Sequence, residues 1–184
     1  MQRFLLVLIS VLFFSGCAGH KYYYYMEPTP LKKEVTKYSL GEVKVNLILG
    51  HGAIPGDNKF ASESVLNQEF YDFIKKNMEE KGILASEKGE NTPEVNIVVN
   101  YIRKFNYGGK ALNKPDVSHD VTVFQNGNKL ARFGKDHYTT AYGFLEDTAV
   151  TLEIAAFTWD EEDEPRDVAL ISSLIVKDLA GLGQ

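Results

Sequence analysis

The spacing of hydrophobic residues changes along this chain of 184 residues, and this change constrains its fold more than any other feature. From Tyr38 to Leu49, apolar and polar residues alternate, which is typical of a strand with one buried face. From Ser62 to Lys81, apolar residues recur every three or four positions, which predicts an amphipathic helix that Ser62 caps and Gly82 ends. The two patterns together predict a helix packed against a sheet.

The same two patterns predict further elements downstream. Alternation predicts a second strand from Val95 to about Tyr107. Two more strands, over residues 117–124 and 130–140, flank Asn126-Gly127, a dipeptide that strongly favours a hairpin turn. Helical spacing after Pro165 predicts a C-terminal helix.

Residues 144–160 fit both spacings. The alternation of Val150, Leu152 and Ile154 allows a strand. A helix is favoured, because a larger apolar set has helical spacing: Phe144, Leu145, Ala149, Leu152, Ala156 and Trp159. The order of elements predicts a single α+β domain over residues 38–184, with an antiparallel sheet of about four strands, an amphipathic helix after the first strand and a C-terminal helix packed on one face.

The first sixteen residues have the organisation of a secretory signal. Arg3 precedes an apolar run from Phe4 to Phe14, and the small residues Ser15 and Gly16 come directly before Cys17. Eleven residues of helix rise about 16 Å, roughly half of the hydrocarbon thickness of a bilayer, so a permanent membrane span is not expected. The alternative to a lipoprotein signal is an ordinary secretory signal in which a cysteine lies near the end by coincidence.

The segment from Phe14 to Cys17 resembles the lipobox of bacterial lipoproteins. The resemblance implies cleavage between Gly16 and Cys17, with diacylglycerol on the Cys17 thiol and an N-acyl chain such as palmitate on its amine. Each buried methylene contributes about 0.8 kcal/mol, so several chains on one residue hold a protein firmly at a membrane. Ala18 rather than Asp follows the cysteine, which implies an outer-membrane lipoprotein that faces the periplasm. No cofactor besides these lipids is expected.

Residues 17–37 are expected to be the lipidated cysteine and a tether, because they contain Pro28 and Pro30 and show no regular spacing. Consecutive tyrosines interrupt this segment. Tyrosine suits the headgroup level of a membrane, but it also favours strands and packing on a domain, so both interpretations stay open. The same residues are candidates for contact with a partner: Tyr22, Tyr23, Tyr24 and Tyr25.

The lipobox, the tyrosine-rich stretch, the helix after a loop, the strand around Val95-Val99, the hairpin and the terminal helix together resemble small Gram-negative outer-membrane lipoproteins of α+β fold. Among these, the chain loosely resembles the PqiC-type auxiliary lipoproteins of intermembrane transport. The resemblance implies the shared fold and, less directly, an auxiliary role in lipid transport.

The usual signatures of enzymes are missing from the sequence. Ser118-His119-Asp120 fails as a catalytic triad, because successive residues of a strand point to opposite faces. His119 and His137 lie too far apart in the expected hairpin to share a metal ion, so no metal is expected. A single cysteine excludes a disulfide framework, and a net charge of −5 gives no reason to expect nucleic acid as a partner. The sequence therefore predicts a protein that is not an enzyme.

Five acidic residues stand in succession directly before Pro165. Carboxylates at a helix N-terminus are favoured by about 0.3–1 kcal/mol each, but this effect does not require five of them. A solvated acidic loop is the first interpretation, and a basic protein partner or calcium are the others, although calcium loops usually bend at a glycine that is missing here. The candidate partner-binding residues are Asp160, Glu161, Glu162, Asp163 and Glu164.

These observations predict a lipid-anchored accessory or assembly factor that binds another component of the cell envelope, most simply an envelope protein. The alternative is a carrier that holds a lipid acyl chain, and a periplasmic hydrolase is the second alternative. An apolar cavity of about 300 Å³ or more between helix 62–81 and the sheet would favour the carrier. A filled core with an exposed apolar or edge-strand patch would favour partner binding.

Overall fold

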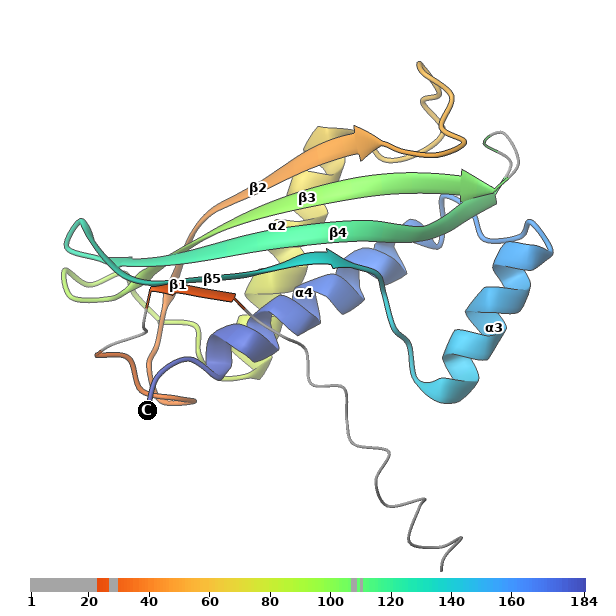
Figure 1. The fold of residues 1–184 in the computed structure, drawn as a ribbon. Helices are drawn as coiled ribbons and strands as arrows, with labels where there is room; N and C mark the ends of the chain where they lie inside the picture. Colours follow the sequence, from red (N-terminus) through yellow and green to blue (C-terminus); the bar gives the residue numbers. More distant parts are fainter. Residues whose placement is uncertain (1–22, 27–29, 107–108, 110) are drawn as a thin grey trace, which may run out of the picture.

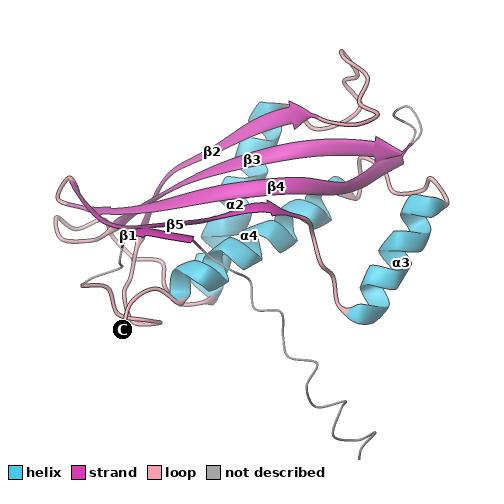
Figure 2. Cartoon of the chain, in the orientation of Figure 1, coloured by secondary structure: helices cyan, strands magenta, loops and turns pink. Residues whose placement is uncertain are grey.

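The computed structural model describes residues 23–26, 30–106, 109 and 111–184. One sheet of five strands has the order β1-β5-β4-β3-β2, and its helices lie on one side of it (Figure 1). Figure 2 shows the same chain by type of secondary structure. In chain order the elements are β1 (Tyr23–Met26), β2 (Ser39–Leu49), α2 (Glu63–Glu80), β3 (Glu94–Asn106), β4 (Ala111–Gln125), β5 (Asn128–Tyr138), α3 (Phe144–Ala155) and α4 (Glu164–Ala180).

The α+β class, the helix after β2 and the C-terminal helix are confirmed. The sheet itself is mixed rather than antiparallel, because β2 and β3 run parallel. The reason is the length of α2: 18 residues span about 27 Å, which returns the chain to the end at which β2 began. The sheet also has one strand more than expected, since β1 adds to β5 at the edge.

The main core lies between one face of the sheet and the helices α2 and α4. Alternate residues of β3, such as Val99 and Tyr101, are buried against Phe70 and Ile74 of α2 and Ile175 of α4. Ser62 caps α2 as predicted, because its hydroxyl accepts a hydrogen bond from the backbone N–H of Val65. In β3, α2 and α4, the alternating and helical patterns therefore bury the faces that they select.

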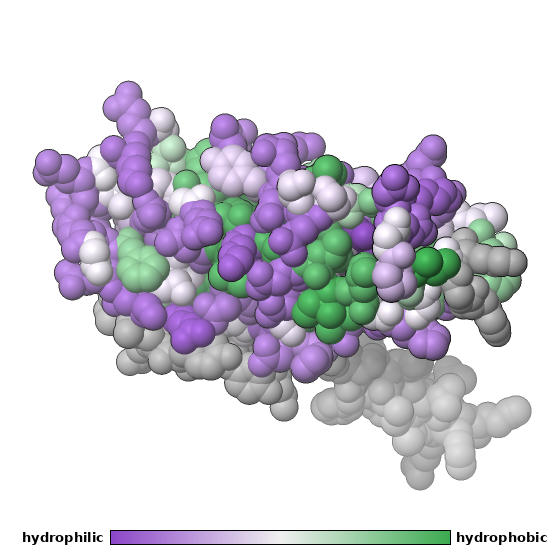
Figure 3. Space-filling model, turned by 90° about the horizontal axis from the view of Figure 1, so that it is seen from above, coloured by the Kyte–Doolittle hydropathy of each residue, from purple (hydrophilic) through white to green (hydrophobic). Residues whose placement is uncertain are grey.

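The opposite face of the sheet carries polar side chains that stay partly in water. Asn46 of β2 donates a hydrogen bond of 2.9 Å to Asn100 of β3, and Asp120 of β4 accepts from Arg132 of β5 at 2.9 Å. Seen from above, hydrophilic side chains cover most of the surface and the hydrophobic ones gather in a smaller central area (Figure 3).

The hairpin between β4 and β5 turns at the predicted dipeptide. Gln125 pairs with Asn128, so Asn126 and Gly127 form a two-residue loop. Both loop residues have positive φ, 52° and 76°, a conformation that Asn and Gly adopt most readily. This turn is confirmed.

Part of the segment that the sequence assigns to the tether packs on the domain. Leu31 lies in the main core, and the backbone N–H of Glu34 donates to the carbonyl of Ala180 at 2.9 Å. Gly183 has a φ of 96°, and a Cβ there would lie 2.2 Å from the Leu31 carbonyl oxygen, so only glycine fits. The C-terminus therefore holds residues 31–34 against the folded body.

Candidate functional site: the outer face of helix α3

Residues 144–155 form helix α3, as predicted, but the hydrophobic side of this helix faces solvent instead of the core. Most of the apolar residues that the helical spacing selected point to solvent: Phe144 is 87% exposed, Leu145 82% and Leu152 64%. Val150 and Ile154 are buried instead. Of the predicted set, Trp159 beyond the end of the helix is buried, as a core aromatic.

The buried side of α3 packs into a second, smaller hydrophobic cluster at the far end of β3 and β4. This cluster contains Phe105 and Leu112 from these strands together with Val150, Ile154 and Trp159. The backbone N–H of Leu112 donates to the carbonyl of Trp159 at 2.8 Å, which joins the segment after α3 to β4. The helix is therefore fixed to the domain rather than loosely attached.

The acidic side chains of α3 also face the domain, where they meet two cations. Asp147 lies 2.5 Å from Lys114, and this hydrogen bond lowers the pKa of the Asp147 carboxyl. Arg166 of α4 lies 3.3 Å from Glu146 and 3.8 Å from Glu153. Each acid of the helix thus has a basic partner on the body of the domain.

The remaining surface of α3 carries no charge at all. At 100° per residue, eight exposed positions fall on one continuous arc of the helix. We call this surface the outer face of α3; it consists of Phe144, Leu145, Thr148, Ala149, Thr151, Leu152, Ala155 and Ala156. Phe157, directly after the helix, adds a further exposed ring. An exposed apolar surface of this kind on a fixed helix is typical of a binding site.

Sequence analysis predicted the helix but missed which face is exposed. The signal that could have revealed it is the placement of charge, because Glu146, Asp147 and Glu153 fall on the same side of the helix as Val150 and Ile154. These acids stay partly exposed and pair with cations of the body, and only the folded chain brings those cations to the helix.

The five acidic residues before Pro165 take part in separate structural contacts. Glu164 is buried and pairs with Arg103 at 2.6 Å and 2.9 Å, and Glu161 lies 2.5 Å from Lys59. Asp163 accepts hydrogen bonds from Arg166 and from the backbone N–H of Asp160. The side chain of Glu162 is exposed, while its backbone N–H bonds to Asp160. Their role in binding a partner stays a prediction.

Other candidate residues lie partly outside the described residues. This holds for the signal, for Gly16 and Cys17 and for Tyr22, so lipidation and cleavage stay predictions. The other three tyrosines, Tyr23, Tyr24 and Tyr25, belong to β1, whose backbone pairs with β5. Contact of these tyrosines with a partner stays a prediction.

The residues considered for catalysis point away from each other. His119 is buried, with Nδ1 2.7 Å from the Tyr138 hydroxyl. Ser118 and Asp120 lie on the other face of β4, as alternation predicts, where Ser118 accepts from the backbone N–H of His137. The His137 ring is exposed and lies 3.4 Å from Asp116, which is on the face of β4 opposite to the buried His119.

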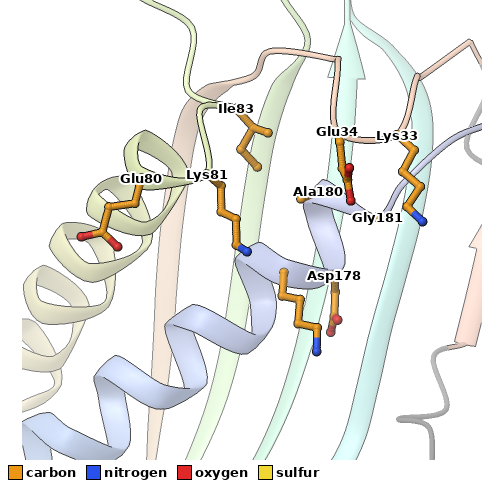
Figure 4. Close-up of a pocket in the computed structure, with 9 residues that line it drawn as sticks. Lys33, Glu34, Glu80, Lys81, Ile83, Asp178, Ala180 and Gly181 are labelled. Carbon is orange, nitrogen blue, oxygen red and sulfur yellow. The ribbon is translucent and has the colours of Figure 1, made fainter.

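A groove of about 720 Å³ lies where the C-terminal ends of α2 and α4 meet the segment 33–34 (Figure 4). Three lysines and three acids line it: Lys33, Lys81, Lys177, Glu34, Glu80 and Asp178. The lysines lie near helix C-termini, where cations are favoured. Because the charges balance and the lining is polar, the groove suits neither an acyl chain nor an anion.

The space between α2 and the sheet is filled. Leu66, Phe70, Ile74 and Met78 of α2 have no exposed surface and pack into the main core. An apolar crevice between the end of β5 and α4, lined by Leu170, Ile171 and Leu174 among others, holds only about 50 Å³. Neither place meets the condition for a carrier of acyl chains.

The β2 edge of the sheet is closed to further strands. The outward backbone N–H groups of Val45 and Leu47 donate to side chains of α2, to Asn67 at 2.6 Å and to Glu63 at 2.9 Å. Occupied edge amides cannot pair with another strand. Of the two kinds of patch expected for a binding protein, the apolar one is therefore available on α3, whereas this edge is not.

No protein-family model and no curated protein matches the chain, so the resemblance to PqiC-type lipoproteins stays a prediction. Within the described residues, helices are too short or too polar to cross a bilayer. The chain is similar to a solved protein described as uncharacterized, at 15% identity and a TM-score of 0.38, covering 80% of this chain and 96% of that one.

Two further solved structures bear the word lipoprotein in their names. A minor lipoprotein from Acinetobacter baumannii is 11% identical with a TM-score of 0.36, covering 78% of this chain and 93% of its own. The rare lipoprotein B from Shewanella oneidensis is 9% identical with a TM-score of 0.33, covering 76% and 94%. These values assign the chain neither a family nor a function.

Proposed function

We propose that this protein is a lipid-anchored, non-enzymatic accessory protein of the cell envelope that binds another envelope component through the outer face of α3. The observation that carries the proposal is the exposure of Phe144, Leu145 and Leu152 on a helix that is otherwise firmly attached. Leaving such side chains in water forgoes about 1.5–3 kcal/mol each, which burial against a partner would recover. The lipobox-like segment that ends at Cys17 supports a position in the periplasm, and Ala18 after it supports the outer membrane.

The filled core favours this proposal over a lipid carrier. A carrier needs an enclosed apolar volume, but the α2 side chains that would line it, such as Phe70 and Ile74, are already packed against the sheet. The residues considered for hydrolysis, Ser118 and His119, lie on opposite faces of β4, which argues against the enzyme alternative.

The anchor is tested by replacing the single cysteine. We expect wild-type cells to incorporate radiolabelled palmitate into the protein and Cys17→Ala cells to incorporate none, because the sequence offers no second thiol. The measurement is labelling followed by immunoprecipitation, with outer-membrane fractionation as a second readout. Labelling that survives the substitution would contradict the anchor.

The binding surface is tested by photocrosslinking in intact envelopes. A benzoyl-phenylalanine at Leu152 should form an adduct with an envelope component, whether lipid or protein. Val65 is a matched control, because it is also an exposed hydrophobic residue on a helix, at 46% exposure. Equal yields at the two positions, or no adduct at Leu152, would overturn the role of the outer face.

A further inference from the structure

We propose that the outer face of α3 binds the surface of the bilayer to which Cys17 is attached, so that the helix holds the domain against the membrane in one orientation. This inference rests on the proposed function, because it requires the lipid anchor. It names the component that the outer face meets.

The reach of the anchor is short. Tyr23, the first residue of β1, is only six residues after Cys17. Six residues span at most about 20 Å even when fully extended. The acyl chains would therefore keep the bilayer surface within about 20 Å of the start of β1 at all times.

The direction of β1 brings this anchored end to the side of α3. β1 is antiparallel to β5, with Tyr23 opposite Gly134 and Met26 opposite Arg132. The start of β1 therefore points toward the C-terminal end of β5. From that end, at Tyr138, the chain enters α3 after only five further residues. Figure 1 shows β1 at the sheet edge and α3 following β5 beyond the end of that edge.

The chemistry of α3 suits the boundary between headgroups and acyl chains. Phe and Leu side chains on one side of a helix are the groups that enter this boundary in surface-bound helices. Glu146, Asp147 and Glu153 point to Arg166 and Lys114 on the body. Contact of the outer face with lipid therefore leaves these acids in their ion pairs and takes no charge out of water.

The short reach also explains why lipid is favoured over a protein as the occupant. A site tethered next to its target meets it at an effective concentration of the order of millimolar. A contact of three or four apolar side chains is then formed for much of the time, although it would be weak for a free protein. A protein partner must compete with the bilayer that the anchor already holds there.

The chain allows a direct test with a site-specific fluorophore. Acylation consumes the Cys17 thiol, so a cysteine introduced as Leu152→Cys is the single reactive thiol of the lipidated protein. The lipidated protein is labelled with the dye NBD and placed in vesicles of phosphatidylethanolamine and phosphatidylglycerol, with and without doxyl-labelled lipid. Val65→Cys is the matched control, and Leu145→Cys is a second position on the outer face.

We expect a blue-shifted emission at positions 152 and 145 that doxyl-labelled lipid quenches at least twofold more than at position 65. Vesicle-bound protein without such quenching would overturn this inference and leave the anchor intact. A blue shift that depends on protein concentration and resists doxyl lipid would assign the face to a second copy or another protein, and would also overturn it. Protein that fails to float with vesicles would instead overturn the anchor. Circular dichroism of each variant confirms that it is folded.

Discussion

Two buried titratable side chains, His119 and Asp178, respond to pH in opposite directions. Burial lowers the pKa of His119 from 6.5 to about 3. Between these pH values His119 is protonated in the unfolded protein but neutral in the folded one. The free energy of unfolding therefore falls as pH drops from about 6.5 to 3. Burial raises the pKa of Asp178 from 3.8 to about 7, and the free energy of unfolding falls as pH rises through that window.

Asp178→Asn should therefore stabilise the protein at pH 8 but not at pH 4. At pH 8 the folded state carries a desolvated carboxylate in the last turn of α4, where the helix dipole also disfavours it. We expect the free energy of unfolding to rise by up to about 4 kcal/mol at pH 8, the equivalent of a pKa raised from 3.8 to about 7. Urea denaturation at the two pH values measures it, and an equal change at both would contradict the titration of Asp178.

Glu164 shows that a residue in an acidic run can be a core residue. It is 1% exposed and forms a bidentate pair with Arg103, which also donates to the Ala61 carbonyl at 2.7 Å. This pair ties the start of α4 to β3.

Glu164→Ala leaves the Arg103 guanidinium buried without its carboxylate. We expect a loss of about 3–5 kcal/mol in the free energy of unfolding, measured by denaturant titration. Glu162→Ala, at an exposed position in the same run, is the control and should change it by less than about 0.5 kcal/mol. Similar losses for both variants would show that the run acts as a single charged segment.

Helix α3 has two faces with different roles. Val150 and Ile154 fasten it to the second hydrophobic cluster, with Lys114 and Arg166 holding its acids. The outer face contributes nothing to this attachment. Stability and binding are therefore carried by different residues of one short helix, which allows each to be changed alone.

Val150→Ala and Leu152→Ala should separate these two surfaces. Val150 has no exposed surface, so its truncation should cost about 1–3 kcal/mol in the free energy of unfolding. Leu152 is 64% exposed, so its truncation should cost less than about 0.5 kcal/mol while weakening contact with vesicles. Chemical denaturation measures the first effect, and quenching by doxyl-labelled lipid of NBD at position 145 measures the second. A large loss of stability for Leu152→Ala would show that this side chain is packed.

In the molecule as a whole, the proposed anchor at Cys17 is only six residues from the first strand of the sheet. β1 and residues 31–34 are part of the folded body, so the flexible length that the sequence assigns to a tether is much reduced. The main core is closed, the β2 edge is capped by Asn67 and Glu63, and α3 stands beyond the end of β5. With the proposed anchor at Cys17, the outer face of α3 would therefore lie near the bilayer.

Lengthening the chain before β1 should loosen this contact without releasing the protein. A flexible Gly/Ser segment of about 20 residues inserted after Ala18 adds roughly 25 Å of average span. The effective concentration of bilayer at α3 then falls, so quenching by doxyl lipid at position 152 should decrease while flotation with vesicles is unchanged. Equal quenching at position 152 in the lengthened and the original protein would contradict the dependence of this contact on the reach of the anchor.

Much of the fold was predictable, because regular spacing depends on local geometry. Tyr38–Leu49 alternates, Leu66, Phe70 and Ile74 repeat at helical spacing, and Asn126-Gly127 demands a tight turn. The parallel pairing of β2 with β3 and the addition of β1 were not predictable in the same way. The direction of β3 relative to β2 depends on the end of the sheet to which α2 returns the chain. The spacing of residues along one strand does not indicate which strand pairs with it.

The amino-acid sequence by itself determined most of the strands and helices, and it predicts the lipid anchor at Cys17. Only the tertiary structure decided which face of α3 is buried. The apolar spacing of Phe144, Leu145 and Leu152 is the same whether that face packs inward or outward. The folded chain decides it, because Val150 and Ile154 pack against Phe105 and Leu112 while the acids reach Lys114 and Arg166, and this leaves the outer face in the open.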